Sequence, residues 1–388
     1  MVWHERDGPP RARIPERAAR RYTNERDGNP MNAPVTELSV RPAAVMPLRI
    51  RVFGPGDRSR WEEFVHRCPD ATFFHRIGWK DIFEHSFGFN THYLLAERDT
   101  QIVGVLPLAE VKSFLFGHAL VSLPFCTYAG VATLEIEALA ALHGYARQLG
   151  EKLGVDHLEL RDRAVREVDW PRQDLYVAFR KPILQKVEDN LAAIPRKQRA
   201  MVRKGIAQGL VSRVDADPAC FFALYADNVH RHGTPPLAKR YFAALLRTFG
   251  RDCEFLTVTD PQGKAVSSVL SFYFRDEVLP YYAGDIEAAR DLAANDFKYW
   301  EVLRRACERG LRVFDLGRSK RGTGAFAFKK NWGLEPMPLA YEYCLYRRER
   351  IPENNPLNPK YRLLMALWRR LPIPVANVIG PHLVKGLG

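Results

Sequence analysis

Short hydrophobic runs separated by turn residues follow one another from residue 47 onward, and their pattern predicts an α/β protein. Residues 47–53 (PLRIRVF), 92–97 (HYLLAE) and 102–111 (IVGVLPLAEV) are typical of β-strands between turns. Residues 138–154 (ALAALHGYARQLGEKLG) are typical of a helix that ends at a glycine. A further strand is expected at 156–162 (DHLELRD).

The same order of elements returns in the second half of the chain. Residues 253–274 (CEFLTVTDPQGKAVSSVLSFYF) have the pattern of a hairpin, like that of residues 92–111. Residues 297–311 (FKYWEVLRRACERGL) then predict a helix that leads into a strand at 312–317 (RVFDLG). An antiparallel meander, a helix and another strand, found twice, predict two α/β domains of one architecture.

The two ends of the chain differ in composition from the middle. The first 46 residues are rich in Pro, Arg and Asn and have no hydrophobic periodicity, so we expect them to be disordered. Met31 and Met46 are alternative translation starts. We therefore divide the chain into a disordered extension (1–46), two domains (47–190 and 191–346) and a basic amphipathic C-terminal segment (347–388).

The C-terminal segment has the pattern of an interfacial helix, and no acidic residue follows Glu353. A cationic amphipathic helix of this kind binds an anionic membrane surface without crossing it. A last helix packed back on the domain is an equally good interpretation of the same pattern. The expected apolar face consists of Leu364, Leu367, Trp368 and Leu371, and the flanking cations are Arg362, Arg369 and Arg370.

Composition and charge exclude several classes of protein. No apolar run reaches the roughly 18–20 residues of a membrane-spanning helix, and the first 30 residues lack the apolar stretch of a secretory signal. We therefore expect a cytoplasmic protein, with a peripheral position at the inner face of the membrane as the alternative. Six scattered cysteines without a C-x-x-C pair predict neither a disulfide framework nor a metal site. A net charge of +13 suits an anionic partner.

Residues 194–213 (IPRKQRAMVRKGIAQGLVSR) concentrate this charge, because they contain six cations and no acidic residue. On a helix, Arg196, Arg199 and Arg203 would share one face. A solvated surface helix and a phosphate-binding face are both compatible with this pattern. Arg199 and Arg203 are therefore candidate substrate-binding residues.

Residues 314–333 (FDLGRSKRGTGAFAFKKNWG) combine a glycine-rich cationic loop with two lysines among aromatic residues. The loop at 320–324 could admit a substrate, while the surrounding aromatic side chains would keep Lys329 partly desolvated. In an extended segment Lys330 would point away from Lys329. The alternative is a strand whose lysines both face water.

Two further stretches contain candidate substrate-binding residues. In 228–246 (NVHRHGTPPLAKRYFAALL), His232 could act as a general base and Arg240 could bind an anion, but the histidine spacing does not predict a metal site. A histidine that only lines the turn is the alternative for His232. In 280–285 (PYYAGD), Tyr282 could line a cleft or belong to the core.

Three of these stretches together resemble the FemAB family, from residue 47 to about residue 346. They are FFHRIGWKDIFEHSFGFNTHYLLAE (73–97), IPRKQRAMVRKG (194–205) and the closing motif at 314–333, in which FDLGR is followed by GAFAFKKNWG. Members of this family are peptidoglycan-bridge aminoacyltransferases, and the resemblance is closest to FemAB-like proteins associated with exosortase and PEP-CTERM exopolysaccharide systems. The resemblance implies two tandem GNAT-like (acyl-CoA N-acyltransferase-like) domains, each with a mixed, mostly antiparallel sheet flanked by helices.

The chemistry that the resemblance implies is attack by an amine on an activated acyl carbon, often the ester of an aminoacyl-tRNA. Phe328 and Lys329 match the family's Phe-Lys pair at the acyl ester, where a cation stabilises the developing oxyanion. The first block places Trp79 at the substrate. Bridge-forming members have a lysine one turn beyond this tryptophan, whereas here Lys80 follows it directly. No metal and no tightly bound cofactor are implied.

We therefore expect a transferase that forms an amide bond on a cell-envelope or exopolysaccharide precursor, with aminoacyl-tRNA or acyl-CoA as the donor. The expected partner is anionic: a tRNA, a phosphorylated sugar or a lipid-linked precursor. One alternative is an acyl-CoA-dependent GNAT enzyme, although residues 285–297 lack the glycines of its pyrophosphate turn. The other alternative is a non-catalytic basic scaffold that binds nucleic acid or membrane.

Overall fold

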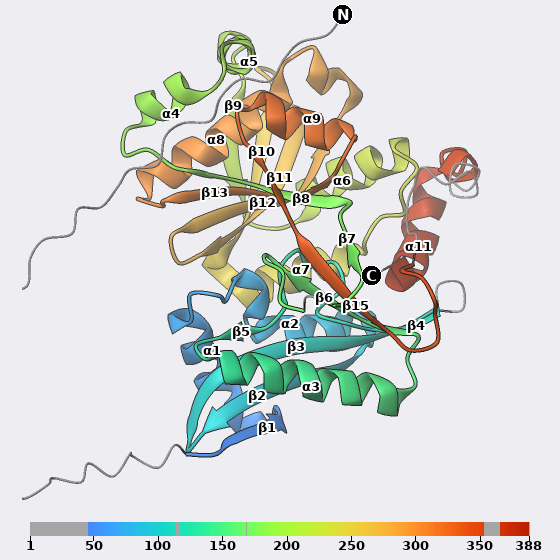
Figure 1. The fold of residues 1–388 in the computed structure, drawn as a ribbon. Coiled ribbons are helices and arrows are strands. Elements are labelled where there is room, and N and C mark those ends of the chain that lie inside the picture. Colours follow the sequence, from blue (N-terminus) through green and yellow to red (C-terminus); the bar gives the residue numbers. More distant parts are fainter. Residues whose placement is uncertain (1–45, 114–116, 168, 353–364, 388) are drawn as a thin grey trace, which may run out of the picture. The chain divides into compact units, whose positions relative to one another are not determined.

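Two mixed β-sheets form the framework of the protein in the computed structural model (Figure 1). The structure describes residues 46–113, 117–167, 169–352 and 365–387. These described residues belong to one compact unit. The disordered extension expected at 1–46 lies outside the described residues, apart from Met46.

The first sheet has the strand order β1-β2-β3-β4-β6-β15-β7, and β5 pairs with β3. Its pairs are antiparallel except that between β4 and β6. Helix α3 (Ile136–Leu153) covers one face through Leu139, Leu142 and Ala146. The strands are β1 (Leu48–Val52), β2 (Asn90–Arg98), β3 (Gln101–Ser113), β4 (Gly117–Val121), β5 (Ala132–Thr133), β6 (His157–Asp162), β7 (Arg172–Gln173) and β15 (Ala340–Leu345).

The second sheet has the order β14-β8-β13-β12-β11-β10-β9. The pair of β12 with β13 is parallel and extends only over Glu277–Val313 and Val278–Phe314, so the two strands diverge toward their carboxyl ends. The other pairs are antiparallel. The strands are β8 (Tyr176–Pro182), β9 (Val211–Asp215), β10 (Cys253–Thr259), β11 (Ala265–Phe274), β12 (Glu277–Asp285), β13 (Val313–Lys320) and β14 (Pro336–Pro338).

Helices cover both sheets, and one hydrophobic cluster joins them. Phe74 and Tyr93 from the first half pack in the same cluster as Phe272 from β11. A second cluster lies between the second sheet and α8. The remaining elements are η1 (Pro55–Asp57), α1 (Arg58–Arg67), η2 (Phe73–His75), α2 (Gly78–Ile82), η3 (Phe83–Phe87), α4 (Val187–Ala193), α5 (Arg196–Ala207), α6 (Ala219–Arg231), α7 (Lys239–Phe249), η4 (Gly250–Asp252), η5 (Glu287–Arg290), α8 (Ala294–Glu308), α9 (Gly324–Asn331), α11 (Ile373–Val384) and η6 (Lys385–Leu387).

The two sheets do not divide at the expected boundaries of 47–190 and 191–346. Strand β8 precedes residue 190 but pairs with β13 in the second sheet, and β15 follows it but pairs with β6 in the first. Each half of the chain therefore gives one strand to the other sheet. The difference arises because hydrophobic periodicity indicates which face of a strand is buried, whereas it does not identify the partner strand.

The expectation of an extended segment at 326–330 is wrong, because this segment belongs to the helix α9. Thr323 caps the helix, and its side-chain oxygen accepts a hydrogen bond from the Phe326 amide at 3.3 Å. Gly333 follows the helix with φ +78°, a left-handed conformation that suits a helix end. The alternating Phe-Ala-Phe pattern is also typical of a strand, but the capping threonine and the two alanines favour a helix.

The C-terminal segment packs on the body of the protein. His230 at the end of α6 lies 2.8 Å from the carbonyl oxygen of Leu371, and Gly380 lies against Pro236. The single apolar face expected for this segment is not formed, because Trp368 is buried while Leu367 is exposed. Leu364 and Arg362 lie outside the described residues. Among the described helices, none has the length and apolar character required to cross a membrane.

Candidate active site

Lys329 is buried between α9 and β13. Its Nζ donates to the carbonyl oxygens of Arg318, at 2.8 Å, and of Gly317, at 3.4 Å, and lies 5.7 Å from the centre of the Phe179 ring. Burial away from water lowers the pKa of Lys329 to about 7. Near neutral pH the side chain is therefore present in both its amine and its ammonium form.

The neighbours of Lys329 in the sequence differ from it in exposure. Lys330 is exposed, and Phe328 is half-buried with its ring 5.3 Å from Tyr299 and 5.9 Å from Trp332. Trp332 is fully buried and donates from Nε1 to Asp296 at 2.8 Å. Phe328 therefore packs toward α8, whereas Lys329 reaches the backbone of β13.

A bulge in β13 supplies the carbonyl groups that Lys329 contacts. The pairing of β13 with β8 shifts between Asp315 and Arg318, and Gly317 has φ +63°. The buried Asp315 carboxylate fixes this turn, because its Oδ1 accepts from the Gly317 amide at 2.7 Å and from the Tyr128 hydroxyl at 3.2 Å. Its Oδ2 lies 3.0 Å from Arg180.

The Arg318 side chain lies in a cluster of tyrosines. Its Nη1 donates to the Tyr341 hydroxyl at 3.1 Å, and its guanidinium lies 4.8 Å from the Tyr176 ring centre. The Tyr341 hydroxyl in turn donates to the Thr127 carbonyl oxygen at 2.8 Å. Tyr341 comes from β15 of the first sheet, so this cluster joins the two sheets at the bulge.

The loop that carries Thr127 holds an uncommon backbone conformation. Leu123 and Phe125 have φ angles of +59° and +62°, which non-glycine residues rarely adopt. Thr127 also lies 3.2 Å from the Tyr281 hydroxyl, oxygen to oxygen. Strained backbone of this kind is concentrated at functional sites in proteins. The loop lies where β12 and β13 diverge.

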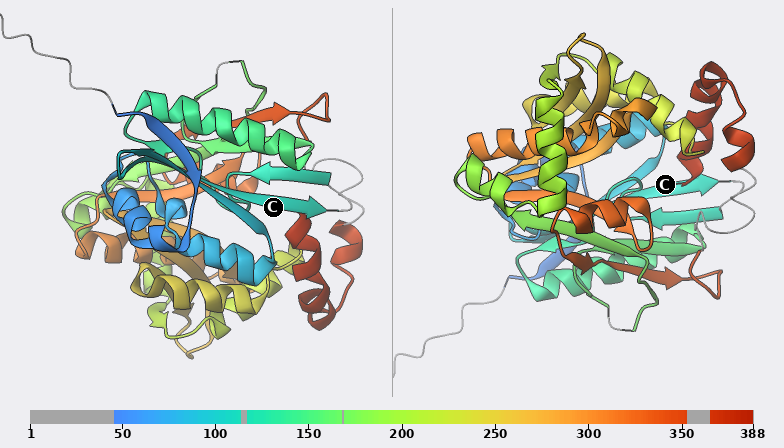
Figure 2. Two further views of the ribbon diagram at one scale, coloured as in Figure 1. Left: turned by 90° about the horizontal axis from the view of Figure 1, so that it is seen from below. Right: turned by 90° about the horizontal axis from the view of Figure 1, so that it is seen from above.

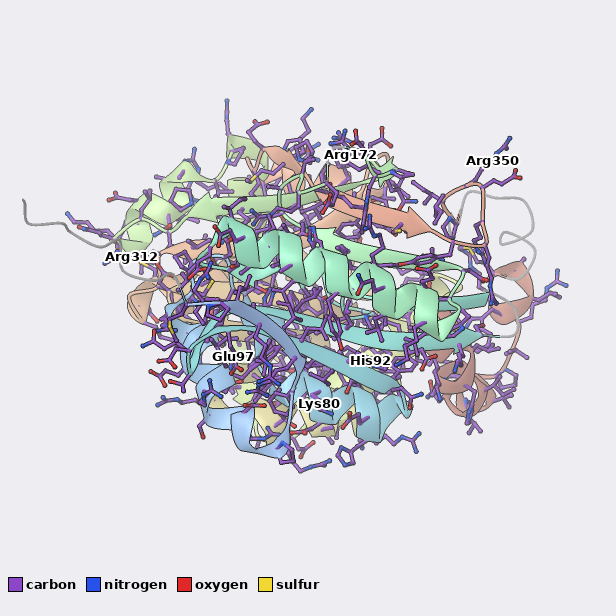
Figure 3. All side chains as sticks on the ribbon, turned by 60° about the horizontal axis from the view of Figure 1, so that its bottom comes forward. Lys80, His92, Glu97, Arg172, Arg312 and Arg350 are labelled. Carbon is purple, nitrogen blue, oxygen red and sulfur yellow. The ribbon has the colours of Figure 1, made fainter. Side chains whose placement is uncertain are left out.

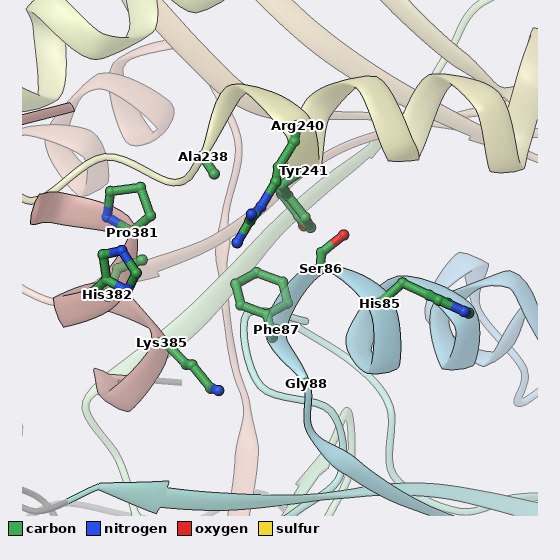
Figure 4. A pocket seen from close by; sticks show the side chains of 11 residues that line it. His85, Ser86, Phe87, Gly88, Ala238, Arg240, Tyr241, Pro381, His382 and Lys385 are labelled. Atoms are coloured by element: carbon green, nitrogen blue, oxygen red, sulfur yellow. The ribbon is translucent and has the colours of Figure 1, made fainter. Parts of the chain in front are cut away.

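A cavity of about 270 Å³ opens between η3, α7 and the C-terminal elements (Figure 4). Figure 4 shows Arg240 extending from α7 and Lys385 extending from the C-terminal end toward the same space, while His85 points away. None of the described lining residues is acidic, so the cavity suits an anionic group. Its walls are His85, Ser86, Phe87, Gly88, Ala238, Arg240, Tyr241, Pro381, His382, Val384 and Lys385.

A row of aromatic side chains joins the cavity wall to the bulge in β13. The hydroxyls of Tyr241 and Tyr282 lie 3.2 Å apart, and the rings of Tyr282 and Tyr281 have centres 4.8 Å apart. Tyr281 then contacts Thr127, which accepts from Tyr341. Burial raises the pKa of Tyr281 and of Tyr282, so both hydroxyls stay protonated and can donate hydrogen bonds.

The basic helix α5 begins close to the end of the helix that carries Lys329. A Cβ atom on Gly333, just after α9, would lie 3.1 Å from Pro195, the residue before α5. Arg203 is exposed, and Arg199 donates to the Ala192 carbonyl oxygen at 2.6 Å. The helix buries its opposite side against α8. Its cations therefore face solvent on the side of the protein where α9 ends.

Three residues of the first block and of the α6–α7 turn are not among the residues that line the cavity. Trp79 is fully buried in the aromatic core and donates from Nε1 to the Phe73 carbonyl oxygen at 3.1 Å. Lys80, labelled in Figure 3, pairs with Glu84 and donates to Thr91 at 3.1 Å. His232 is exposed at the end of α6 and is not among the residues that line the cavity.

The structure therefore brings together some of the expected residues and adds others. Arg240 lines the cavity, Tyr282 belongs to the aromatic row, and Lys329 lies at the bulge. Sequence reasoning missed Lys385, Phe87, Arg318 and Tyr341. Of these residues, only Arg318 could have been identified from the sequence, because it stands within the closing motif. The others reach the site through contacts between elements that are distant in the sequence.

The turn before α8 differs from a typical pyrophosphate turn. It forms the short helix η5 and then a residue, Ala293, with φ +55°. Next to it Lys298 is fully buried and pairs with Asp285 at 2.7 Å. The turn itself contains the acidic residues Glu287 and Asp291 and no glycine. Its composition is unfavourable for close approach of a pyrophosphate.

Comparison with known proteins identifies the fold. Residues 192–330 match the family model described as an acetyltransferase (GNAT) domain. The crystal structure of FemX has a TM-score of 0.58 to this chain, at 14% identity, over 82% of this chain and 100% of that one. The fold is GNAT-like. The two helix-flanked sheets thus confirm the predicted fold class.

Two further solved structures have the same fold at low sequence identity. One is the C-terminal domain of a putative lysylphosphatidylglycerol synthetase from Agrobacterium fabrum, with a TM-score of 0.51, 15% identity, and coverage of 74% of this chain and 91% of that one. The other is a conserved protein of unknown function from Bacteroides thetaiotaomicron, with a TM-score of 0.52, 10% identity, and coverage of 77% and 100%. No curated protein sequence matches this chain.

Proposed function

We propose that the protein is an acyl- or aminoacyltransferase that forms an amide bond on a cell-envelope or exopolysaccharide precursor. The observation that carries this proposal is the position of Lys329, desolvated on α9 and held against the bulge of β13 in a GNAT-like fold. The names of two structural neighbours, FemX and a putative lysylphosphatidylglycerol synthetase, are compatible with an aminoacyltransferase. The sequence resemblance to FemAB-like proteins of exosortase systems suggests the exopolysaccharide precursor.

Lys329 supplies the charge that such a reaction requires. The amine of the acceptor attacks the acyl carbon, the carbon–oxygen bond of the ester breaks, and the leaving alkoxide takes up the proton that the amine loses and becomes a hydroxyl. An ammonium has three N–H donors, of which Arg318 and Gly317 accept two. The third can donate to the acyl oxygen as negative charge develops on it. Phe328 packs against Tyr299 and Trp332 on the α8 side, so the Phe179 ring, 5.7 Å from Nζ, forms the adjoining apolar wall.

The two cationic surfaces fit anionic groups of the substrates. The exposed face of α5 suits the phosphates of an RNA, so it supports aminoacyl-tRNA as the donor with its ester near α9. The cavity with Arg240 and Lys385 suits the phosphate of an acceptor precursor. The aromatic row through Tyr282 connects the cavity with the bulge of β13 at Lys329. An acyl-CoA donor is less well supported, because the turn before α8 is acidic and lacks glycine.

Native mass spectrometry of the freshly purified full chain tests the proposal. We expect a retained RNA or a phosphorylated glycan precursor, and transfer of a labelled aminoacyl group from tRNA to an amine of that precursor. A retained acyl-CoA that labels the acceptor would replace aminoacyl-tRNA as the donor. Tight binding of RNA or lipid without transfer of any acyl group would overturn the proposal and favour a non-catalytic scaffold.

A further inference from the structure

The last helix, α11, has a buried side and an exposed apolar side. Ala376, Gly380 and Val384 recur every four residues and are buried against the body of the protein. The other side is aliphatic, and Val378 is 70% exposed. The exposed aliphatic side chains of this side, called here the α11 face, are Val375, Val378, Ile379 and Leu383.

The α11 face is concentrated in one element. Val375 and Val378 stand three residues apart, so they lie on the same side of the helix. Helix α11 has 12 residues and is therefore about 18 Å long, which is shorter than the roughly 30 Å core of a bilayer. A partner that covers this face would meet it side-on. Contiguous exposed apolar surface of this kind marks an interaction site.

The charges around the α11 face identify the chemistry of its partner. Helix α11 contains no Asp, Glu, Lys or Arg, while Arg369 and Arg370 precede it and Lys385 follows it. No acidic residue follows Glu353. Aliphatic side chains flanked by cations complement a bilayer whose acyl chains lie beneath anionic headgroups. A nucleic acid would leave the aliphatic side chains uncovered.

The same helix forms a wall of the cavity. Pro381, His382 and Val384 of α11 and the following Lys385 line it, opposite Arg240 (Figure 4). Both views in Figure 2 show the C-terminal helices, in dark red, at one margin of the fold. We propose that the α11 face docks on an anionic phospholipid bilayer and so presents the cavity to the phosphate of a lipid-linked substrate. The second part rests on the proposed transferase function.

Vesicle flotation of the full chain tests the docking step directly. We expect the protein to float with phosphatidylcholine vesicles that contain phosphatidylglycerol and to remain largely unbound with phosphatidylcholine alone. V375E/V378E should lower the vesicle partition coefficient at least about tenfold, because two valines that would enter the bilayer are replaced by anions. Its melting temperature should stay close to the wild-type value, since both valines are exposed.

V211E/V214E is the matched control. These two valines are also exposed and three residues apart, but they lie on β9. The control adds the same negative charge and should leave flotation unchanged. Equal losses in both variants would overturn a specific role for the α11 face. Wild-type protein that does not float, with V375E/V378E converting a dimer to a monomer, would also overturn docking and assign the face to self-association.

Flotation separates this inference from the proposed function, because vesicle binding requires no turnover. A protein that floats through α11 but transfers no acyl group would retain the docking surface and lose the transferase assignment. A protein that transfers an acyl group to a water-soluble precursor but does not bind vesicles would retain the transferase assignment and lose the docking surface. R369Q/R370Q should reduce the preference for phosphatidylglycerol and leave thermal stability unchanged.

Discussion

The Nζ of Lys329 donates a hydrogen bond to the carbonyl oxygen of Arg318 at 2.8 Å, while the Arg318 guanidinium contacts tyrosines. Arg318 reaches the Tyr341 hydroxyl on the other sheet, at 3.1 Å. The bulge in β13 therefore lies between the desolvated amine of Lys329 and the guanidinium of Arg318, which contacts tyrosines. This arrangement concentrates donors at the place where β12 and β13 diverge.

Replacement of Lys329 by methionine should remove catalysis and keep the fold. Methionine retains much of the length and the apolar stem of lysine but has no donor for a developing oxyanion. We expect a loss of roughly 10²–10³-fold in kcat with an equal loss in kcat/KM, as when one oxyanion donor is removed. Steady-state kinetics with the substrates found by mass spectrometry give the measurement.

Lys330→Met is the internal control for that variant. Lys330 is on the same helix and is exposed, so the change in composition is identical. We expect kcat within about twofold of the wild-type value, because exposed lysines away from a site contribute little. Equal, small effects of the two substitutions would contradict a catalytic role for Lys329 and leave it as a buried structural residue.

The lowered pKa of Lys329 should make stability depend on pH in a definite direction. The pKa is about 7 in the folded protein and near 10.5 in the unfolded chain. Between these values the unfolded chain binds more protons, so this residue makes the free energy of unfolding rise with pH. Urea unfolding at pH 7 and pH 9 should show a gain that is about 2 kcal/mol smaller in Lys329→Met.

Lys181 provides an independent check on this sign. Burial lowers its pKa to about 8, and its Nζ lies 5.7 Å from the ring centre of Trp332. Lys181→Met should also reduce the gain in stability, but chiefly above pH 8. Buried tyrosines and cysteines have raised pKa values and oppose both effects at high pH. For that reason the free energy of unfolding of each variant is compared with that of the wild type at the same pH.

Local patterns in the sequence were sufficient for most elements and for the fold class. The helix at 138–154 corresponds to α3, which ends at Gly154 with φ +65°, and the hairpin at 253–274 corresponds to β10 and β11. The exchange of β8 and β15 between the sheets was not predictable, because periodicity does not specify a partner strand. The same limit explains why Tyr341, on β15, was not recognised at the site.

The candidate site was predicted in part for the same reason. Lys329 and Arg240 stand in conspicuous local motifs, and both take positions compatible with the expected chemistry. Trp79 also stands in a motif, but its indole is fully buried among aromatic rings. Lys385 lies far along the chain in a segment whose packing depends on Pro236 and His230. No spacing rule connects it with Arg240.

Arg240 should determine the affinity of the cavity for phosphate groups. Its guanidinium and the Lys385 ammonium are directed into the same space (Figure 4). Arg240→Gln should weaken binding of inorganic pyrophosphate about tenfold, because a charge-assisted hydrogen bond is lost. Calorimetric titration gives the dissociation constants. Lys239→Gln removes the adjacent cation, which does not line the cavity, and should leave them unchanged. Equal losses would assign the effect to net charge alone.

The basic helix α5 should bind an RNA donor through its phosphates. R199Q/R203Q removes two cations from one side of the helix, so the plot of log affinity against log salt should lose a slope of about two. The melting temperature should fall only slightly, since Arg203 is exposed and Arg199 loses one hydrogen bond, to the Ala192 carbonyl oxygen. R247Q/R251Q is the matched control, because these two exposed arginines are also four residues apart but lie at the end of α7 and in η4. If the two double variants lose equal slope, binding follows overall charge and α5 is not the RNA site. A salt dependence lost only in R199Q/R203Q places the donor's phosphates beside the helix that carries Lys329.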